Sequence, residues 1–255
     1  MTNISKDFFV KEVSLHKVVV ESDFISITYL LDGEENNIRL KYPDVRFDSG
    51  LFKDASKKMQ FAVSLAVFGI ARFGAVLPDR VDLSKYAEWI HPDLITFIQY
   101  VLRGHWSEHR YQVGRMDYLH PVFFFGEKQP GLNSNWPIWE LQDPPHRVLL
   151  ASGSGKDSVL CSLMLEAAGI SYDLLTCLHD YYGSVDNQDT LFAKVNDNLK
   201  CENQYKIIVH DEYSHWLDKR VTAFKVGELT NHFRKIWVNI ILNRKAKRQQ
   251  KLLQG

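Results

Sequence analysis

One short run of small and polar residues has the composition of an anion-binding loop: Ser152-Gly153-Ser154-Gly155-Lys156-Asp157-Ser158. The apolar residues 148–150 before it are typical of a buried parallel strand. The residues after it, up to Gly169, have the periodicity of a helix. Glycines let the backbone approach a ligand closely, and the first N–H groups of a helix have no intrahelical acceptor. The sequence therefore predicts a phosphate site between this strand and this helix.

Two kinds of phosphate loop could account for the run. The Walker loop has the pattern G-x-x-x-x-G-K-[ST]. Gly155-Lys156 fits that pattern, but Leu150 stands at its first glycine and Asp157 at its hydroxyl residue. The run instead resembles the pyrophosphate loop (PP-loop) of the ATP pyrophosphatases, and it matches the form S-G-G-G-K-D-S except at Ser154. The alternative without function is a strand–helix turn that happens to be rich in Gly and Ser.

The resemblance implies a role in ATP binding for each residue of the run. The β- and γ-phosphates would be held through N–H and hydroxyl donors of Ser152, Gly153, Ser154, Gly155 and Ser158. Lys156 would be a point charge near them. Ser154 replaces a loop glycine, which is tolerable if its φ is negative. Asp157 is expected to cap the helix or to orient the loop, and ligation of Mg²⁺ is the alternative.

Two more polar pairs follow the next two strands that the sequence predicts, at 172–178 and 206–209. These pairs are His179-Asp180 and His210-Asp211. Parallel strands joined by helices place their carboxyl ends at one edge of the sheet, where ligands bind. Both pairs are therefore expected beside the phosphate loop. His179 and His210 are candidate acid–base groups, and Asp180 and Asp211 are candidates for metal or ribose contact.

Within the ATP pyrophosphatases, the order of parts is similar to that of the UDP-N-acetylmuramoyl-L-alanyl-L-glutamate epimerase family. A hairpin containing Thr28–Gly33 and an apolar helix come first, then a second helix from Asp93, a polar segment ending near Arg110-Tyr111, and the loop. That family uses ATP and Mg²⁺ to adenylate the terminal L-glutamate of a nucleotide-linked muramoyl dipeptide, and so epimerises it in peptidoglycan synthesis. Adenylation removes the carboxylate charge that opposes a carbanion at the α-carbon.

Two other kinds of function remain open. Another PP-loop enzyme, forming an amide or modifying tRNA, would share the loop; the lack of a Cys pair and of a basic N-terminal domain argues against tRNA thiolation. A nucleotide-binding relative without catalysis is the other alternative, because the chain after Ser158 is short for such a domain.

Composition excludes several classes of protein. The formal net charge of zero gives no overall attraction to nucleic acid, although the end of the chain is basic. The apolar run at 61–71 is too short for a confident membrane span, and the first twenty residues do not form a signal peptide. The cysteines have no metal-ligand spacing, and Cys161 and Cys177 are expected to be buried thiols. A cytoplasmic protein is the expectation.

The fold class expected is α/β, in two domains joined by a linker. Residues 1–125 would be an α+β domain, 126–145 a linker, and 146–255 a PP-loop domain that ends in a basic helix and, by resemblance, has a flavodoxin-like parallel sheet. The first domain would contain strands at 18–20, 24–31 and 38–42, the last two joined by a longer loop, and helices from 54 and 92. Residues 76–83 would be an edge strand or loop. His105 and His109 are expected at the surface.

Overall fold

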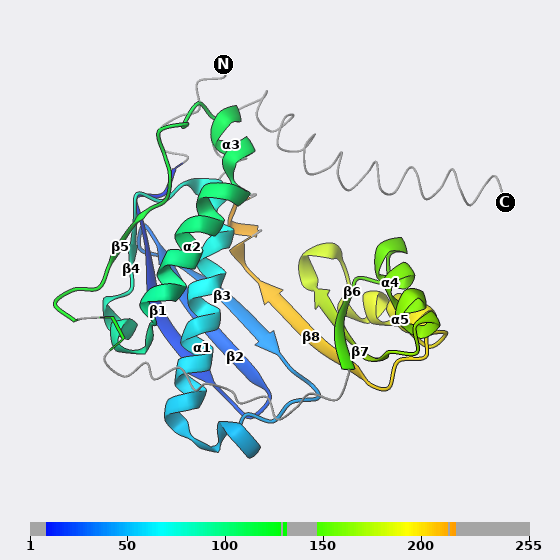
Figure 1. Cartoon of the computed structure of the whole chain (residues 1–255). Coiled ribbons are helices and arrows are strands. Elements are labelled where there is room, and N and C mark those ends of the chain that lie inside the picture. Colours follow the sequence, from blue (N-terminus) through cyan, green and yellow to red (C-terminus); the bar gives the residue numbers. More distant parts are fainter. Residues whose placement is uncertain (1–8, 129, 132–146, 214, 218–255) are drawn as a thin grey trace.

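The computed structural model describes residues 9–128, 130–131, 147–213 and 215–217. These residues form an α/β fold with one eight-stranded mixed sheet, in the order β5-β4-β1-β2-β3-β8-β7-β6 (Figure 1). The strands are β1 (Glu12–Val20), β2 (Phe24–Leu31), β3 (Glu34–Lys41), β4 (Arg80–Asp82), β5 (Val122–Phe124), β6 (Arg147–Ser152), β7 (Ser171–His179) and β8 (Gln204–Asp211).

The sheet runs through both regions that flank the expected linker. β1, β2 and β3 are antiparallel, whereas β6, β7 and β8 are parallel to one another. β8 joins the two sets because it pairs antiparallel with β3, with Ile38 opposite Asp211. The carboxyl ends of β7 and β8 therefore lie beside the amino-terminal half of the chain. Most of the expected linker and the whole basic C-terminal segment lie outside the described residues.

The hairpin between β2 and β3 is tighter than expected. Its loop is Asp32-Gly33 alone, and both residues have positive φ, 50° and 89°. A two-residue turn in which both residues have positive φ has a backbone twist that matches the right-handed twist of the flanking strands. The Asp32 carboxylate also accepts the backbone N–H groups of Lys11 and Glu12, both at 2.9 Å. The strand expected at residues 18–20 is longer, because β1 begins at Glu12.

The strand β4 is an interior strand, where an edge strand or loop was expected. It lies between β1 and β5 and is parallel to both. Pro78 precedes β4 by two residues, so the missing N–H of the proline removes no bond from the ladder. The outer strand on this side is β5, in which Val122 and Phe124 are exposed.

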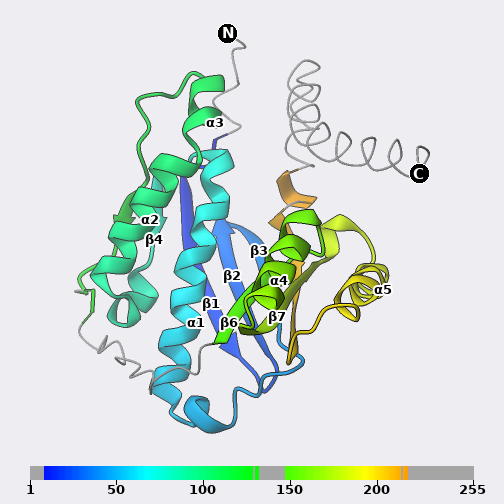
Figure 2. The ribbon, with the colours of Figure 1, turned by 45° about the vertical axis from the view of Figure 1, so that its right-hand side comes forward.

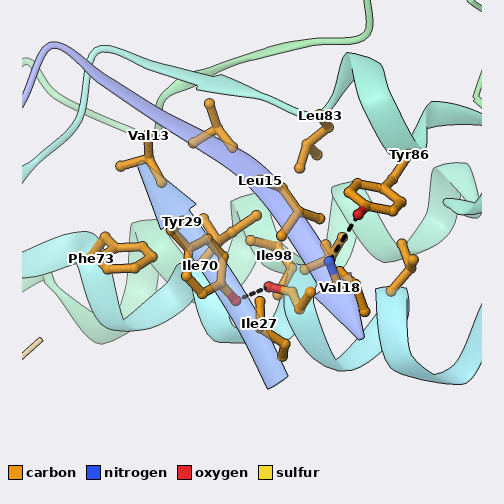
Figure 3. Packing of buried hydrophobic residues seen from close by; sticks show 14 of the residues in the cluster. Val13, Leu15, Val18, Ile27, Tyr29, Ile70, Phe73, Leu83, Tyr86 and Ile98 are labelled. Carbon is orange, nitrogen blue, oxygen red and sulfur yellow. Dashed lines mark hydrogen bonds between the residues drawn. The ribbon is translucent and has the colours of Figure 1, made fainter. Parts of the chain in front are cut away.

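Two helices cover one face of the antiparallel half and form the main core with it (Figures 1 and 3). α1 (Ala55–Gly69) is capped by the Asp54 carboxylate and continues into the 3-10 segment η3 (Ile70–Val76). α2 (Pro92–His105) follows, then the short α3 (Ser107–Gln112). In the core, the Tyr29 hydroxyl donates to the Ala66 carbonyl at 2.6 Å.

The segment Ala55–Val76 is long and apolar enough to cross a membrane. However, 61% of its most apolar window is buried inside the protein. Burial of that kind is typical of a core helix that is apolar nearly all round. It is the one such segment among the described residues.

Two further helices lie on the opposite face, over the parallel strands (Figure 2). They are α4 (Lys156–Ala167) and α5 (Val185–Asn196). The strand register places Tyr172, Leu174 and Thr176 beneath them, and all three are buried. Cys177 and His179 point to the other face, which α1 covers farther along the sheet. The helices thus change faces between the two halves of the sheet.

The outer side of α4 is unusually apolar. Leu160, Leu163 and Met164 are 50–62% exposed, although an apolar stripe with this spacing normally packs on a core. The helix rests on the sheet through other positions, including the fully buried Ser162. Cys161 and Cys177 are also exposed, which corrects the expectation of buried thiols. Periodicity alone does not show which face of such a helix meets the sheet.

Candidate functional site

The expected strand, loop and helix are all present at residues 147–167. β6 ends at Ser152, and α4 begins at Lys156 after Gly155 as its N-cap residue. Ser154 has a φ of 49°, so the negative φ that would make a serine tolerable at this position is not found. The left-handed conformation costs a residue with a Cβ roughly 1–2 kcal/mol. In this loop the positive φ falls on Ser154, and not on Gly153 or Gly155.

A buried asparagine holds the strained serine in place. The Ser154 hydroxyl donates to Oδ1 of Asn196 at 3.2 Å, and the Asn196 amide donates to the Thr176 hydroxyl at 3.3 Å. The Ser154 N–H donates to the Ser152 hydroxyl oxygen at 3.2 Å. All four residues are buried. The end of α5 and strand β7 therefore fix the loop, a connection that the sequence did not indicate.

The first turn of α4 is the part of this loop best suited to hold an anion. Its N-cap residue, Gly155, makes no side-chain cap bond. The N–H groups of the first helical residues have no acceptor inside a helix, and the dipole makes that end positive. Lys156 and Asp157 are both exposed there. Asp157 lies inside the first turn, so the expectation that it caps the helix was wrong.

The serine hydroxyls of the loop are engaged within the protein. Ser158 donates to the Gly155 carbonyl at 3.0 Å, while Ser152 and Ser154 belong to the buried network. A phosphate would therefore meet main-chain N–H groups first. Neither Gly153 nor Gly155 needs to be glycine for steric reasons, since an added Cβ would meet nothing within 4 Å at either position.

The structure brings together the two His-Asp pairs at the carboxyl ends of β7 and β8. Asp180 contacts both histidines, with its Oδ1 3.4 Å from Nδ1 of His179 and its Oδ2 3.2 Å from Nδ1 of His210. The strand register puts the two histidines on opposite faces of the sheet, His179 inward and His210 exposed. Ser152 is paired with Thr176, so His179 lies about 10 Å farther along β7.

His179 is the more constrained of the two histidines. Its Nδ1 accepts the Tyr181 N–H at 3.1 Å, which assigns the proton of the neutral ring to Nε2. Nε2 lies 3.8 Å from Oδ2 of Asp211. Burial lowers the pKa of His179, and the charges of Asp211 and Asp180 oppose that shift. The lowered pKa favours the neutral ring, whose N–H then lies towards a carboxylate.

Arg72 completes the cluster from the other half of the chain. Its guanidinium, which comes from the first turn of η3, donates to the Asp211 carboxylate and, at 3.2 Å, to Oδ1 of Asn36. The group lies 5.1–5.9 Å from the centres of three aromatic rings, those of Tyr29, Phe73 and Tyr213. The only sequence signal for this contact was an arginine that ends a long apolar run.

The metal candidates are not preassembled. Among the described residues, no three His, Cys, Asp or Glu side chains are grouped so that they could hold a metal ion. Mg²⁺ bound with a nucleotide commonly uses one or two carboxylates together with phosphate oxygens. Asp157 and Asp180 each offer one exposed or half-buried carboxylate for such a contact.

The histidine pair 105 and 109 does not form a surface pair. His109 is buried, its Nε2 is 2.9 Å from the Ala75 carbonyl oxygen, and burial lowers its pKa. This corrects the expectation of a surface residue. The side chain of His105 lies outside what the structure describes.

No family model, curated protein or solved structure matches this chain. The features of the chain that bear on its function are the loop at residues 152–158 and the cluster of His179, Asp211 and Arg72.

Proposed function

We propose that residues 152–158 bind the phosphates of ATP. The observation that carries this proposal is the combination of an uncapped α4 amino terminus with the fixed, positive-φ Ser154 immediately before it. Strained backbone is commonly retained where it serves a ligand. The main-chain N–H groups of the first α4 turn would bind the phosphate oxygens, and the Lys156 ammonium would add charge. Asp157 or Asp180 would be the protein ligand of the Mg²⁺ that accompanies ATP, and the ion would supply positive charge for the leaving pyrophosphate.

The reaction proposed is adenylation followed by epimerisation of an L-glutamate residue. A substrate carboxylate oxygen attacks the α-phosphorus of ATP, and pyrophosphate leaves. The α-proton of the acyl adenylate is removed and a proton returns on the other face; water then releases AMP and the D-isomer. The substrate proposed is UDP-N-acetylmuramoyl-L-alanyl-L-glutamate, which places the activity in the cytoplasm. The PP-loop resemblance supports this choice of chemistry.

His179 is the best placed group in the cluster to carry a proton. A neutral imidazole is a base near pH 7, and Asp211 can stabilise the imidazolium that forms. To accept the α-proton, Nδ1 must give up its bond from the Tyr181 N–H. His210, exposed on the other face of the sheet with its Nδ1 3.2 Å from Oδ2 of Asp180, is the candidate for the group that returns the second proton.

A nucleotide-binding protein without catalysis is the second candidate. The observation that favours it is that both nitrogens of His179 already face groups of the protein. The other PP-loop adenylating enzymes, which form amides or modify tRNA, would share the loop and differ in the acceptor.

Pyrophosphate release tests the proposed reaction. The chain is incubated with ATP, Mg²⁺ and the muramoyl dipeptide nucleotide in D₂O, and deuterium at the glutamate α-carbon is measured together with pyrophosphate. Both are expected with the wild type. His179→Gln should lose deuterium incorporation while keeping pyrophosphate release, and His16→Gln, at an exposed position of β1, is the matched control.

Each alternative has its own outcome in this experiment. ATP binding without pyrophosphate for any carboxylate, amide or RNA acceptor would establish the non-catalytic function. Full deuterium incorporation by His179→Gln would remove His179 from the proposal.

A further inference from the structure

Strand β7 extends beyond its neighbour β6. β6 ends at Ser152, which pairs with Thr176, whereas β7 continues to His179. The N–H of Leu174 donates to the carbonyl of Asn203, on the β8 side of the strand. The main-chain groups of successive residues alternate between the two sides of a strand, so those of His179 point to the β6 side. Their partners must therefore come from outside the ladder between β6 and β7.

The carboxamide of Gln188 takes the place of the strand that has ended. Gln188 lies on α5, and its Oε1 accepts the His179 N–H at 3.2 Å. Its Nε2 donates to the His179 carbonyl at 2.7 Å and to the Gly183 carbonyl at 3.1 Å. One side chain thus satisfies both main-chain groups of His179 and also bonds the turn that follows.

The turn that Gln188 closes carries the partners of the imidazole. It runs from His179 to Gly183, and Gln188 bonds the main chain at both ends. Within it, the Tyr181 N–H donates to Nδ1 of His179 at 3.1 Å, and Oδ1 of Asp180 lies 3.4 Å from the same nitrogen. A shift of the strand end relative to the turn would change both distances.

The same helix also holds the loop that contains Ser154. Asn196, the last residue of α5, bonds the hydroxyls of Ser154 and Thr176. Positions i and i+8 lie on one side of a helix and roughly 12 Å apart along its axis, which is the spacing of Gln188 and Asn196. Thr176 and His179 are about 10 Å apart along β7. α5 therefore runs antiparallel to β7 and fixes His179 relative to the loop.

We propose that Gln188 is a positioning residue for proton transfer by His179. This inference rests on the function proposed above for His179. The bonds of Gln188 are to the main chain, so it sets the place of the imidazole through the backbone. A carboxamide is suited to this role because it pairs with an N–H and a C=O at once and carries no charge.

A single-turnover experiment separates proton transfer from adenylation. The full chain is mixed with ATP, Mg²⁺ and the muramoyl dipeptide nucleotide in D₂O. Gln188→Ala should slow deuterium incorporation at least about tenfold, because a displacement of about 1 Å in a reacting group can cost on the order of 100-fold in rate. Pyrophosphate release should not change, since Asn196 still holds the loop. Asn187→Ala, at an exposed position of α5, is the matched control and should preserve both rates.

NMR titration of the His179 imidazole is a second measurement, and it does not depend on the reaction. Burial lowers the pKa of His179, so loosening the end of β7 in Gln188→Ala should raise this pKa towards its unfolded value of about 6.5. The pKa of His109, which bonds the Ala75 carbonyl in the other half of the chain, should stay unchanged. Gln188→Met keeps the length of the side chain without its hydrogen bonds. It should behave like Gln188→Ala in both experiments, and it replaces that variant if the alanine protein does not fold.

The outcomes distinguish this inference from the proposed function. If the folded wild type releases no pyrophosphate and incorporates no deuterium, the proposed function fails, and the pKa of His179 then decides whether Gln188 positions the ring. In an active protein, unchanged deuterium incorporation in the Gln188 variants would overturn the positioning role, as would an equal loss of pyrophosphate release. An unchanged pKa of His179 in these variants would overturn it as well.

Discussion

The carboxylate of Asp211 accepts a hydrogen bond from the guanidinium of Arg72, which lies 139 positions earlier in the chain. Asp211 ends β8, and Arg72 lies in the segment that follows α1. The two side chains are 11% and 16% exposed, so the ion pair is mostly shielded from water. The same carboxylate faces His179 at 3.8 Å. The pair therefore connects the main core to the carboxyl end of the parallel strands.

Removing one member of this pair should destabilise the protein strongly. Asp211→Ala leaves the Arg72 cation buried without its counter-charge, for which the expected cost is about 3–5 kcal/mol of unfolding free energy. Urea unfolding measures the change. Asp48→Ala, in the exposed Arg46–Asp48 pair, is the matched control and should leave the midpoint almost unchanged. A loss no larger than that of the control would contradict the structural role of the pair.

The stability of the protein should fall as the pH falls below about 6.5, the pKa of histidine in an unfolded chain. Burial lowers the pKa of both His109 and His179 in the folded state. Between that value and the lower folded pKa values, the unfolded chain binds more protons, so acid favours unfolding. The stabilisation that comes from keeping these two rings neutral is complete above about pH 6.5, and it decreases progressively below that pH.

NMR titration of the imidazole Cε1–H signals measures these pKa values directly. Both are expected below the unfolded value. His109→Gln should flatten the decline of stability in acid, since its buried ring then no longer titrates. A pKa at or above about 6.5 for either ring would contradict the burial of that ring.

Substitutions at Ser154 should separate backbone strain from hydrogen bonding. Ser154→Ala keeps the strained φ and leaves the buried Asn196 oxygen without its donor, which is expected to cost about 1–3 kcal/mol. Ser154→Gly loses the same bond but relieves the strain, so it should be more stable than Ser154→Ala by about 1 kcal/mol. Thermal unfolding of the two variants gives the comparison, and equal stabilities would mean that φ is not strained.

Local patterns were sufficient to predict the order of the elements around the site. The apolar run, the small-residue loop and the helix at 147–167 are present, as are the strands that carry His179 and His210. Each of these depends on neighbours along the chain. For the same reason α1 and α2 were found close to their expected starts at 54 and 92.

Long-range relationships were not predictable in this way. The pairing of β3 with β8 and the contact of Arg72 with Asp211 join residues that no local pattern connects. The burial of His109 depends on Ala75, in the segment after α1. The φ of Ser154 depends on Asn196, at the end of another helix. Which side of α4 is exposed depends on how the helix is placed on the sheet. The apolar periodicity of the helix does not predict that placement.

Calorimetric titration with ATP and Mg²⁺ measures whether residues 152–158 bind ATP. In the folded protein Gly155 has room for a Cβ, so Gly155→Ala should fold normally and hinder only a phosphate that approaches the loop. Gly104→Ala, which also has room for its Cβ, is the matched control. We predict binding by the wild type and the control, and an affinity at least about tenfold weaker for Gly155→Ala, equivalent to about 1.4 kcal/mol. Equal affinity in all three proteins, or no binding by the folded wild type, would rule out ATP binding at residues 152–158.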